Sequence, residues 1–277
     1  MELLLLGTKG GPRISADGPG PSQLVEHAGR RVLVDAGEGV VHQLVRAGVD
    51  PATVRDIFIT HHHSDHNVAL GNVLMAAWAH GADEPIRVHG PPPLREIVGH
   101  LLAAHRPDIA VRVADEGRVD LRDLVEVVEL DGTGGPVALG GMRVSATAVE
   151  HAPVTPALAY RFDADGASLV ISGDTAPSEA LVALASGADL LVHEVVHPEH
   201  VREHRTNADW TRLRRHLLES HTSIAEVGAV ARRAGVRTLV LSHLVPGGVT
   251  EEQWRSGAGS TGGLDLVVGA DLMRFSL

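Results

Sequence analysis

The chain has 277 residues, of which 44% are apolar and 21% charged, and its formal net charge is −11. These values are ordinary for a globular protein, and the length suffices for one large α/β domain or two small ones. The absence of cysteine excludes disulfide bonds and thiolate metal ligands, so a metal ion would have to be held by imidazole and carboxylate groups, which suit zinc, manganese or iron.

The basic residues argue against a nucleic-acid-binding protein. Lys9 is the only lysine, and the arginine-rich segment is a short "RLRRH" at 212–216. Proteins that bind nucleic acid usually carry a basic stripe, and a helix with a few arginines is more often a solvated face. We therefore expect 212–216 to be solvated surface, and we do not expect a nucleic-acid partner.

The first residues, "MELLLLGTKGG", predict a buried strand that ends in a glycine turn. They lack the basic start of a signal peptide, and their apolar run is too short for one. No apolar run reaches the length of a membrane span. We expect a cytoplasmic protein without membrane contact.

The first half of the chain predicts alternating strands and helices. The expected elements are strands at 2–7, 22–27 and 30–37, a helix at about 39–48, a strand at 55–60, a helix at about 68–80, a strand at 86–90 and a helix at 94–105. The stretch 110–150 predicts several strands broken by the turn "DGTGGP".

The second half repeats this rhythm. We expect strands at 157–163, 168–172, 189–194, 237–242 and 264–268. Pro177 and Gly187 bracket one expected helix, and Ser223 with Glu226 forms a capping-box pattern for another that ends at Gly235. The segment containing "EEQW" is expected to be a glycine-rich loop.

Two segments are alike, "RDIFITH" at 55–61 and "RTLVLSH" at 237–243. Each places a histidine just past the C-terminal end of a buried strand, where ligands of α/β sheets gather. No change of composition marks a boundary. We expect a single domain over 1–277, built from two similar halves.

Four histidines and an aspartate lie between residues 61 and 66. In extended chain His61 and His63 point the same way and can meet one metal ion, while His62 points away. Asp65 and His66 lie where the chain turns and can face a second ion. Three more metal-competent residues end later strands: His151, Asp174 and His243.

"THHHSDH" at 60–66 matches the H-x-H-x-D-H signature of the metallo-β-lactamase superfamily, and the later three residues match its remaining metal motifs in order. "LVDAGEG", with Asp35, resembles its first, structural motif. The resemblance covers the whole chain. It implies an α/β fold, the αββα four-layer sandwich of that superfamily.

The resemblance also implies a site with two zinc ions, for which Mn2+ or Fe2+ could stand. His61, His63 and His151 would hold one ion, Asp65, His66 and His243 the other, and Asp174 would bridge them. A hydroxide bridging the ions would be the nucleophile, and Asp65 would also orient or deprotonate it. The other histidines without partner spacing are expected at the surface or behind the site: His27, His42, His80, His89, His100, His105, His200, His204 and His216.

The chemistry expected is hydrolysis. Superfamily members that bind two irons for redox work carry glutamate where this chain has His63. "DLLVHEVVH" at 189–197 followed by "SHTSIAEVG" from 220 resembles the tRNase Z and arylsulfatase-like branch. That match implies that Glu194 orients His221, and that His221 donates a proton to the leaving oxygen or holds the oxyanion.

The sequence favours a small anionic ester, an aryl sulfate or a phosphodiester, as the substrate. The basic arm with which tRNase Z grips tRNA is not visible, and "LVPGGV" follows His243 in place of that family's Ser-x-Arg-Tyr. The alternatives are a tRNase Z-like RNA 3′-processing endonuclease, a lactone hydrolase and a noncatalytic metal-binding scaffold. The branch also implies a homodimer.

Three further expectations concern the surroundings of the site. Arg13, in a loop that resembles this branch, could meet an anionic group or be a solvated loop residue. The polar segment 195–212 could cover the cleft as a lid, with Trp210 or Trp78 lining an aryl pocket. For Trp78 the core reading is favoured.

Overall fold

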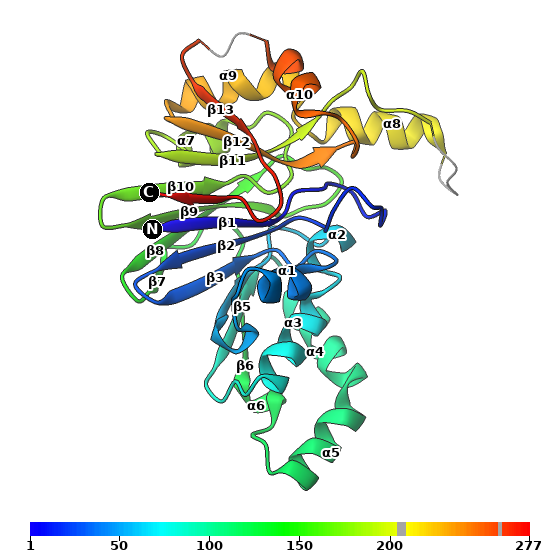
Figure 1. Cartoon of the computed structure of the whole chain (residues 1–277), viewed down its shortest axis with the longest axis vertical. Coiled ribbons are helices and arrows are strands. Elements are labelled where there is room, and N and C mark those ends of the chain that lie inside the picture. Colours follow the sequence, from blue (N-terminus) through cyan, green and yellow to red (C-terminus); the bar gives the residue numbers. More distant parts are fainter. Residues whose placement is uncertain (204–208, 260–261) are drawn as a thin grey trace.

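The computed structural model describes residues 1–203, 209–259 and 262–277 and contains two seven-stranded sheets (Figure 1). The first sheet has the order β14-β1-β2-β3-β4-β5-β6. Its strands are β14 (Arg274–Ser276), β1 (Glu2–Gly7), β2 (Ser22–His27), β3 (Arg30–Val34), β4 (Asp56–Phe58), β5 (Ile86–Gly90) and β6 (Val125–Glu129). The strand at the C-terminus pairs antiparallel with β1, so the two chain ends lie side by side.

The second sheet has the order β13-β12-β11-β10-β9-β8-β7. Its strands are β13 (Asp265–Val268), β12 (Thr238–Val245), β11 (Leu190–Val196), β10 (Ala167–Ile171), β9 (Ala157–Ala164), β8 (Met142–Val149) and β7 (Val137–Leu139). Pairing is parallel from β3 to β6 and from β10 to β13. Each sheet therefore presents the carboxyl ends of several strands at one edge, the usual place for ligands.

The molecule has four layers, and an apolar cluster lies between each pair of neighbouring layers. One fills the space between the sheets and includes Leu3, Phe58 and Tyr160. The other two cover the outer face of each sheet with helices. The helices on the first sheet are α1 (Val40–Arg46), α3 (Leu70–Ala79) and α4 (Leu94–Ala104), and those on the second are α7 (Glu179–Leu184), α9 (Ile224–Ala234) and α10 (Glu251–Ala258). The expected αββα sandwich is confirmed.

Several expected elements are wrong. Residues Arg106–Glu116 form helix α5 where strands were expected, because Pro107 stands in the first turn and Arg112 bridges Asp108 and Glu116 at helical spacing. The β-branched residues there suggest a strand, but only Ile109 is buried. The rest of 110–150 does hold strands, after a short helix α6 (Leu121–Leu124).

The "EEQW" segment is also helical. Thr250 and Gln253 form a capping box that starts α10, and Trp254 is the buried residue of this helix. The expected box at Ser223 does not form: its hydroxyl donates to the Glu226 side chain instead. The expected helix at 68–80 is preceded by α2 (Ser64–Asn67), and α8 (Trp210–Glu219) was not expected.

Within the described ranges, no helix combines the length and apolar character needed to cross a bilayer.

Candidate metal centre

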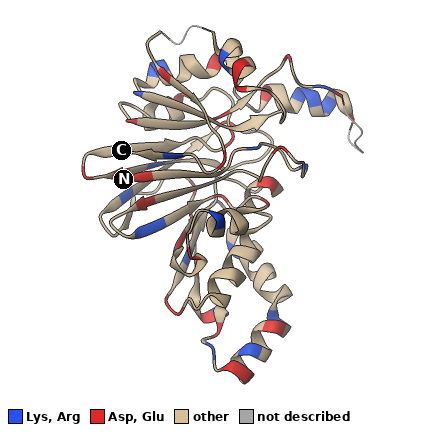
Figure 2. Ribbon diagram, in the orientation of Figure 1, with Lys and Arg blue, Asp and Glu red and all other residues tan. Residues whose placement is uncertain are grey.

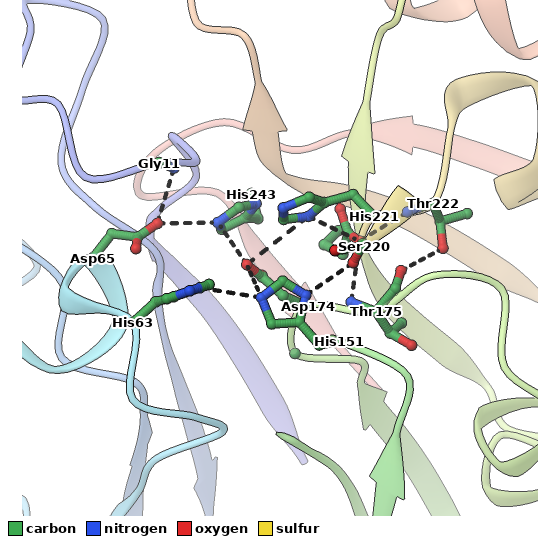
Figure 3. Close-up of polar contacts among 12 residues, drawn as sticks. Gly11, His63, Asp65, His151, Asp174, Thr175, Ser220, His221, Thr222 and His243 are labelled. Atoms are coloured by element: carbon green, nitrogen blue, oxygen red, sulfur yellow. Dashed lines mark hydrogen bonds and ion pairs between the residues drawn. The ribbon is translucent and has the colours of Figure 1, made fainter. Parts of the chain in front are cut away.

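The seven expected ligands come together at the edge where strands of both sheets end. Figure 3 shows His63, Asp65, His151, Asp174 and His243 among them. His61 and His63 follow β4, and Asp65 and His66 lie in α2. The other three come from the second sheet: His151 follows β8, Asp174 follows β10 and His243 lies in β12. The site therefore lies at the seam between the two halves.

One group contains His61, His63 and His151. His63 Nδ1 lies 3.1 Å from Nε2 of His61 and 3.1 Å from Nε2 of His151. All three side chains are buried or half-buried. Three ring nitrogens thus converge on one small volume.

Hydrogen bonds among the three rings cannot satisfy all of these ring nitrogens. Nδ1 of His151 lies 2.9 Å from the carbonyl of Ser220, which can only accept, so that nitrogen carries the proton. The Thr60 hydroxyl lies 2.9 Å from the Asp35 carboxylate and donates to it, so it accepts from Nδ1 of His61 at 3.1 Å. Both Nε2 atoms then present lone pairs, and His63 Nδ1 can donate to only one of them. This donor set fits a divalent cation.

The acid–base properties of these rings agree. Burial lowers the pKa of His61 well below its usual value and that of His151 below its usual value. Burial together with the neighbouring imidazoles lowers the pKa of His63 to about 4. The three rings are therefore neutral at neutral pH, as metal ligands must be.

The second group contains Asp65, His66 and His243. Asp65 Oδ2 lies 3.2 Å from His243 Nε2 and 3.8 Å from His66 Nε2, and accepts the Gly11 backbone N–H at 2.9 Å. A Cβ atom at Gly10 would come within 2.6 Å of His243 Nδ1, so the N-terminal loop can approach this histidine only with glycine there. These residues are candidate ligands of a second ion.

Asp174 lies between the two groups. Its Oδ1 is 3.3 Å from His66 Nε2, and its Oδ2 is 3.3 Å from His243 Nε2 and 3.7 Å from His61 Nε2. The side chain is fully enclosed, and although burial opposes ionisation, the surrounding histidines hold its pKa well below the usual range. An ionised carboxylate in this position can share its oxygens between two cations.

Asp35 orients His66, a member of the second group. Its carboxylate accepts the Thr60 N–H at 2.8 Å and lies 2.8 Å from His66 Nδ1, which directs His66 Nε2 toward Asp174. Asp35 has φ of 59° and His243 has φ of 46°, conformations that residues other than glycine rarely adopt. Backbone in this region costs free energy and concentrates at functional sites.

His221 and Glu194 form the expected pair. His221 Nδ1 lies 3.3 Å from Glu194 Oε1 and 4.0 Å from Asp174 Oδ2. Burial alone would lower the pKa of His221, but the Glu194 carboxylate outweighs it and raises that pKa to about 9. His221 is therefore an imidazolium at neutral pH, directly beside the metal groups.

Two backbone donors that were not expected hold Glu194 in place. The N–H groups of Thr175 and Thr222 donate to Glu194 Oε1 at 3.1 and 2.9 Å. Both threonines directly follow a site residue, Asp174 or His221, so the same turns carry the site residues and the donors. In the sequence, the two donors could therefore be found as the residues that directly follow Asp174 and His221.

His216 is closer to the site than the sequence indicates. It lies in α8, and its ring centroid is 5.7 Å from His63, 5.8 Å from His151 and 5.8 Å from His221. Ring nitrogens of His216, His151 and His221 all lie within 4.8 Å of one another. The spacing of His216 in the sequence could not predict that it lies near the site, because this proximity depends on where α8 lies.

The other named residues have structural surroundings. His62 Nε2 donates to the Pro91 carbonyl at 2.7 Å, away from the cluster. Trp78 is a buried residue of α3 and donates to the Val119 carbonyl, whereas Trp210 packs beside Val196 and Val245. His89 is buried against Phe58. His204, and with it part of the expected lid, lies outside the described residues.

Arg13 is placed near the second group. It lines a cavity of about 100 Å³ together with Lys9, Ile14 and Asp65. Arg13 and Asp65 therefore line the same cavity.

Comparisons with known proteins agree with this geometry. Residues 1–220 match the family described as anti-Pycsar protein Apyc1. Ribonuclease Z of Mycobacterium bovis is 39% identical over 99% of this chain and 97% of its own length.

Solved structures show the same fold. The metallo-β-lactamase fold protein YhfI from Bacillus subtilis matches with a TM-score of 0.76 and 18% identity over 99% of this chain and 98% of its own. The short form of human tRNase Z matches with a TM-score of 0.70 and 19% identity over 100% of this chain and 99% of its own.

Proposed function

The chain belongs to the ribonuclease Z branch of the metallo-β-lactamase superfamily, and from that premise we propose that it is a metal-dependent hydrolase that cleaves phosphodiester bonds in RNA. The observation that carries this proposal is the position of Asp174. It lies between two histidine groups and 4.0 Å from His221, a protonated imidazole. The arrangement combines two cation sites with a proton donor.

The groups His61–His63–His151 and Asp65–His66–His243 would each hold one divalent ion, with Asp174 shared. When bound, such ions lower the pKa of water and neutralise charge on a phosphodiester. Zinc suits imidazole and carboxylate ligands, and manganese and iron remain alternatives.

The protein's own groups supply the remaining chemistry. Asp65, fixed by the Gly11 N–H, can orient the attacking water or accept its proton. His221 can donate a proton to the leaving oxygen, because its pKa of about 9 keeps it charged at neutral pH. Glu194 positions His221 and is itself held by two backbone N–H groups.

The names of the relatives reverse the order of substrates expected from the sequence. An aryl sulfate and a phosphodiester both develop charge on nonbridging oxygens, so the site's charges suit either. Ribonuclease Z, with 39% identity over nearly the full length, favours the phosphodiester of RNA over the sulfate. The tRNase Z-like alternative therefore becomes the first candidate.

The test is cleavage of a hairpin RNA with a single-stranded 3′ extension by zinc-loaded protein. We expect a discrete product with the wild type and its loss in His221→Ala. Bis(p-nitrophenyl) phosphate and p-nitrophenyl sulfate serve as comparison substrates. Turnover of the sulfate with intact RNA would overturn the RNA assignment, and inertness toward all three would favour a binding protein.

A further inference from the structure

Helix α8 lies beside the metal centre and extends beyond the edge of the sheets (Figure 1). It starts at Trp210, where the Asp209 side chain accepts the Arg212 N–H, and no residue in it is fully buried. Trp210 and Leu217 hold it to the body by packing against Val196, Val201 and Val245. The helix thus has one attached face and several free ones.

The C-terminal end of α8 reaches the site. The Ser220 carbonyl, just after the helix, accepts from His151, and the Ser220 hydroxyl is 3.1 Å from His216 Nδ1. This contact leaves Nε2 of His216 free of the helix, beside the rings of His63, His151 and His221. His216 therefore marks the side of α8 that faces the candidate metal centre.

The same side carries arginine farther out. Residues four apart lie above one another on a helix, so Arg212 is on the His216 face, one turn or about 5.4 Å farther from the metal groups. Arg215 is three residues from Arg212 and adjoins it. Arg214 projects from the opposite flank, because it is two residues from Arg212 and from His216.

These arginines are unlike most others in the chain. Among the described residues, no acidic side chain forms an ion pair with Arg212, Arg214 or Arg215. Elsewhere most arginines are paired, for example Arg112 with Asp108 and Arg122 with Asp120. Figure 2 shows blue bands grouped on α8, which has three arginines against one glutamate in a chain of charge −11.

We propose that the face of α8 formed by His216, Arg212 and Arg215 binds the nucleotide chain that flanks the scissile phosphodiester. His216 contacts the substrate next to the metal groups, and the two guanidinium groups bind the following phosphates as forks of donors. This inference rests on the proposed function, and it assigns a role to a face that is exposed at Arg212 and Arg215, as the sequence indicated.

The chemistry points to a polynucleotide and not to a small diester. Arg212 lies a full helical turn beyond His216, and a substrate with one phosphate held at the metal groups does not extend that far. A chain with a phosphate at each nucleotide does. Because no described acidic side chain pairs with Arg212 or Arg215, these two groups can bind phosphates without breaking an ion pair, and phosphate binding by such groups makes association depend on salt.

The experiment compares Arg212→Gln with Arg214→Gln, a change of equal charge on the opposite flank of the same helix. The zinc-loaded proteins are assayed on the 3′-extended hairpin RNA and on bis(p-nitrophenyl) phosphate. We expect the ratio of kcat/KM for RNA to that for the small diester to fall about tenfold in Arg212→Gln, through KM. In Arg214→Gln the ratio should stay within about twofold, because charges farther than about 8 Å are screened at physiological salt.

A binding measurement separates this inference from the proposed activity. Anisotropy of a fluorescein-labelled RNA of the same sequence reports the contact without turnover when both substitutions are made in zinc-loaded His221→Ala protein, in which cleavage is blocked. We expect weaker binding by Arg212→Gln and a salt slope smaller by about 0.7 per lost phosphate contact. Equal RNA affinity and equal ratios in both variants would overturn the α8 inference, even with RNA cleaved by the wild type.

The experiment also recognises the opposite case, in which the hydrolase proposal fails and the α8 inference holds. If the wild type cleaves neither substrate while Arg212→Gln still loses RNA affinity, the hydrolase proposal fails and the α8 surface stands. Thermal melting of both variants checks that the substitutions leave the fold intact.

Discussion

Glu194 Oε1 lies 3.3 Å from His221 Nδ1 and accepts two backbone N–H groups at the same time. A carboxylate held in this way cannot turn from its histidine without leaving two buried donors unpaired. The pair is therefore a rigid unit that fixes the direction of the imidazolium beside Asp174.

The first prediction concerns this unit. His221→Ala should lower kcat for RNA by about 10²- to 10⁴-fold, the usual contribution of a general acid. The loss on bis(p-nitrophenyl) phosphate should be much smaller, because p-nitrophenolate leaves without a proton. Glu194→Gln should show the same contrast more weakly. Equal losses on both substrates would contradict proton donation by His221 and indicate a structural effect.

The second prediction separates neighbouring histidines. His63→Ala should lose about one of two bound metal ions, because three converging ring nitrogens become two. His62→Ala should keep both, since His62 bonds the Pro91 carbonyl. Metal content after dialysis, measured by plasma mass spectrometry, decides the matter. Equal depletion in the two variants would refute the ligand assignment.

The third prediction concerns the support behind His66. Asp35→Asn keeps the shape and tolerates the positive φ of this position, but it removes the charge that orients Nδ1 of His66. Zinc affinity should fall about 10- to 100-fold. Competition with a chelating dye measures it. An unchanged affinity in a folded variant would show that Asp35 serves only the backbone.

The fourth prediction is a proton count. Burial opposes charge on His66, yet Asp174, Asp35 and Asp65 raise its pKa well above the usual value, so metal-free protein carries a proton on this ring at pH 7. A metal ion bound at Nε2 must expel it, so zinc binding should release about one proton from this residue. Calorimetry in buffers of different ionisation enthalpy measures the release. An enthalpy independent of buffer would contradict it.

The metal-ligand candidates could be located from the sequence because most of them lie near the C-terminal end of a strand or in the turn after it, and parallel strands bring such ends to one edge. His61, Asp174 and His243 are examples. The α8 surface could not be located this way. The position of α8 depends on packing of Trp210 and Leu217 against a small apolar cluster, and no periodicity in the sequence encodes that contact.

Helix α5 shows the opposite difficulty. Its Ile109, Val111 and Val113 are typical of strands, and the salt bridges of Arg112 become visible only once the helical spacing is considered. In this segment the ion pairs between residues four apart outweigh the strand propensity of the β-branched residues. Charged residues at this spacing are evidence for a helix even where β-branched residues suggest a strand.

The division of ligands between the sheets has a further consequence. His61 and His63 belong to the first half and His151 to the second; Asp65 and His66 belong to the first and His243 to the second. Neither half alone contains a complete set for either ion. Under the proposed function, a chain whose halves have docked incorrectly would lack both metal sites, so its metal content would report whether the two halves have assembled correctly.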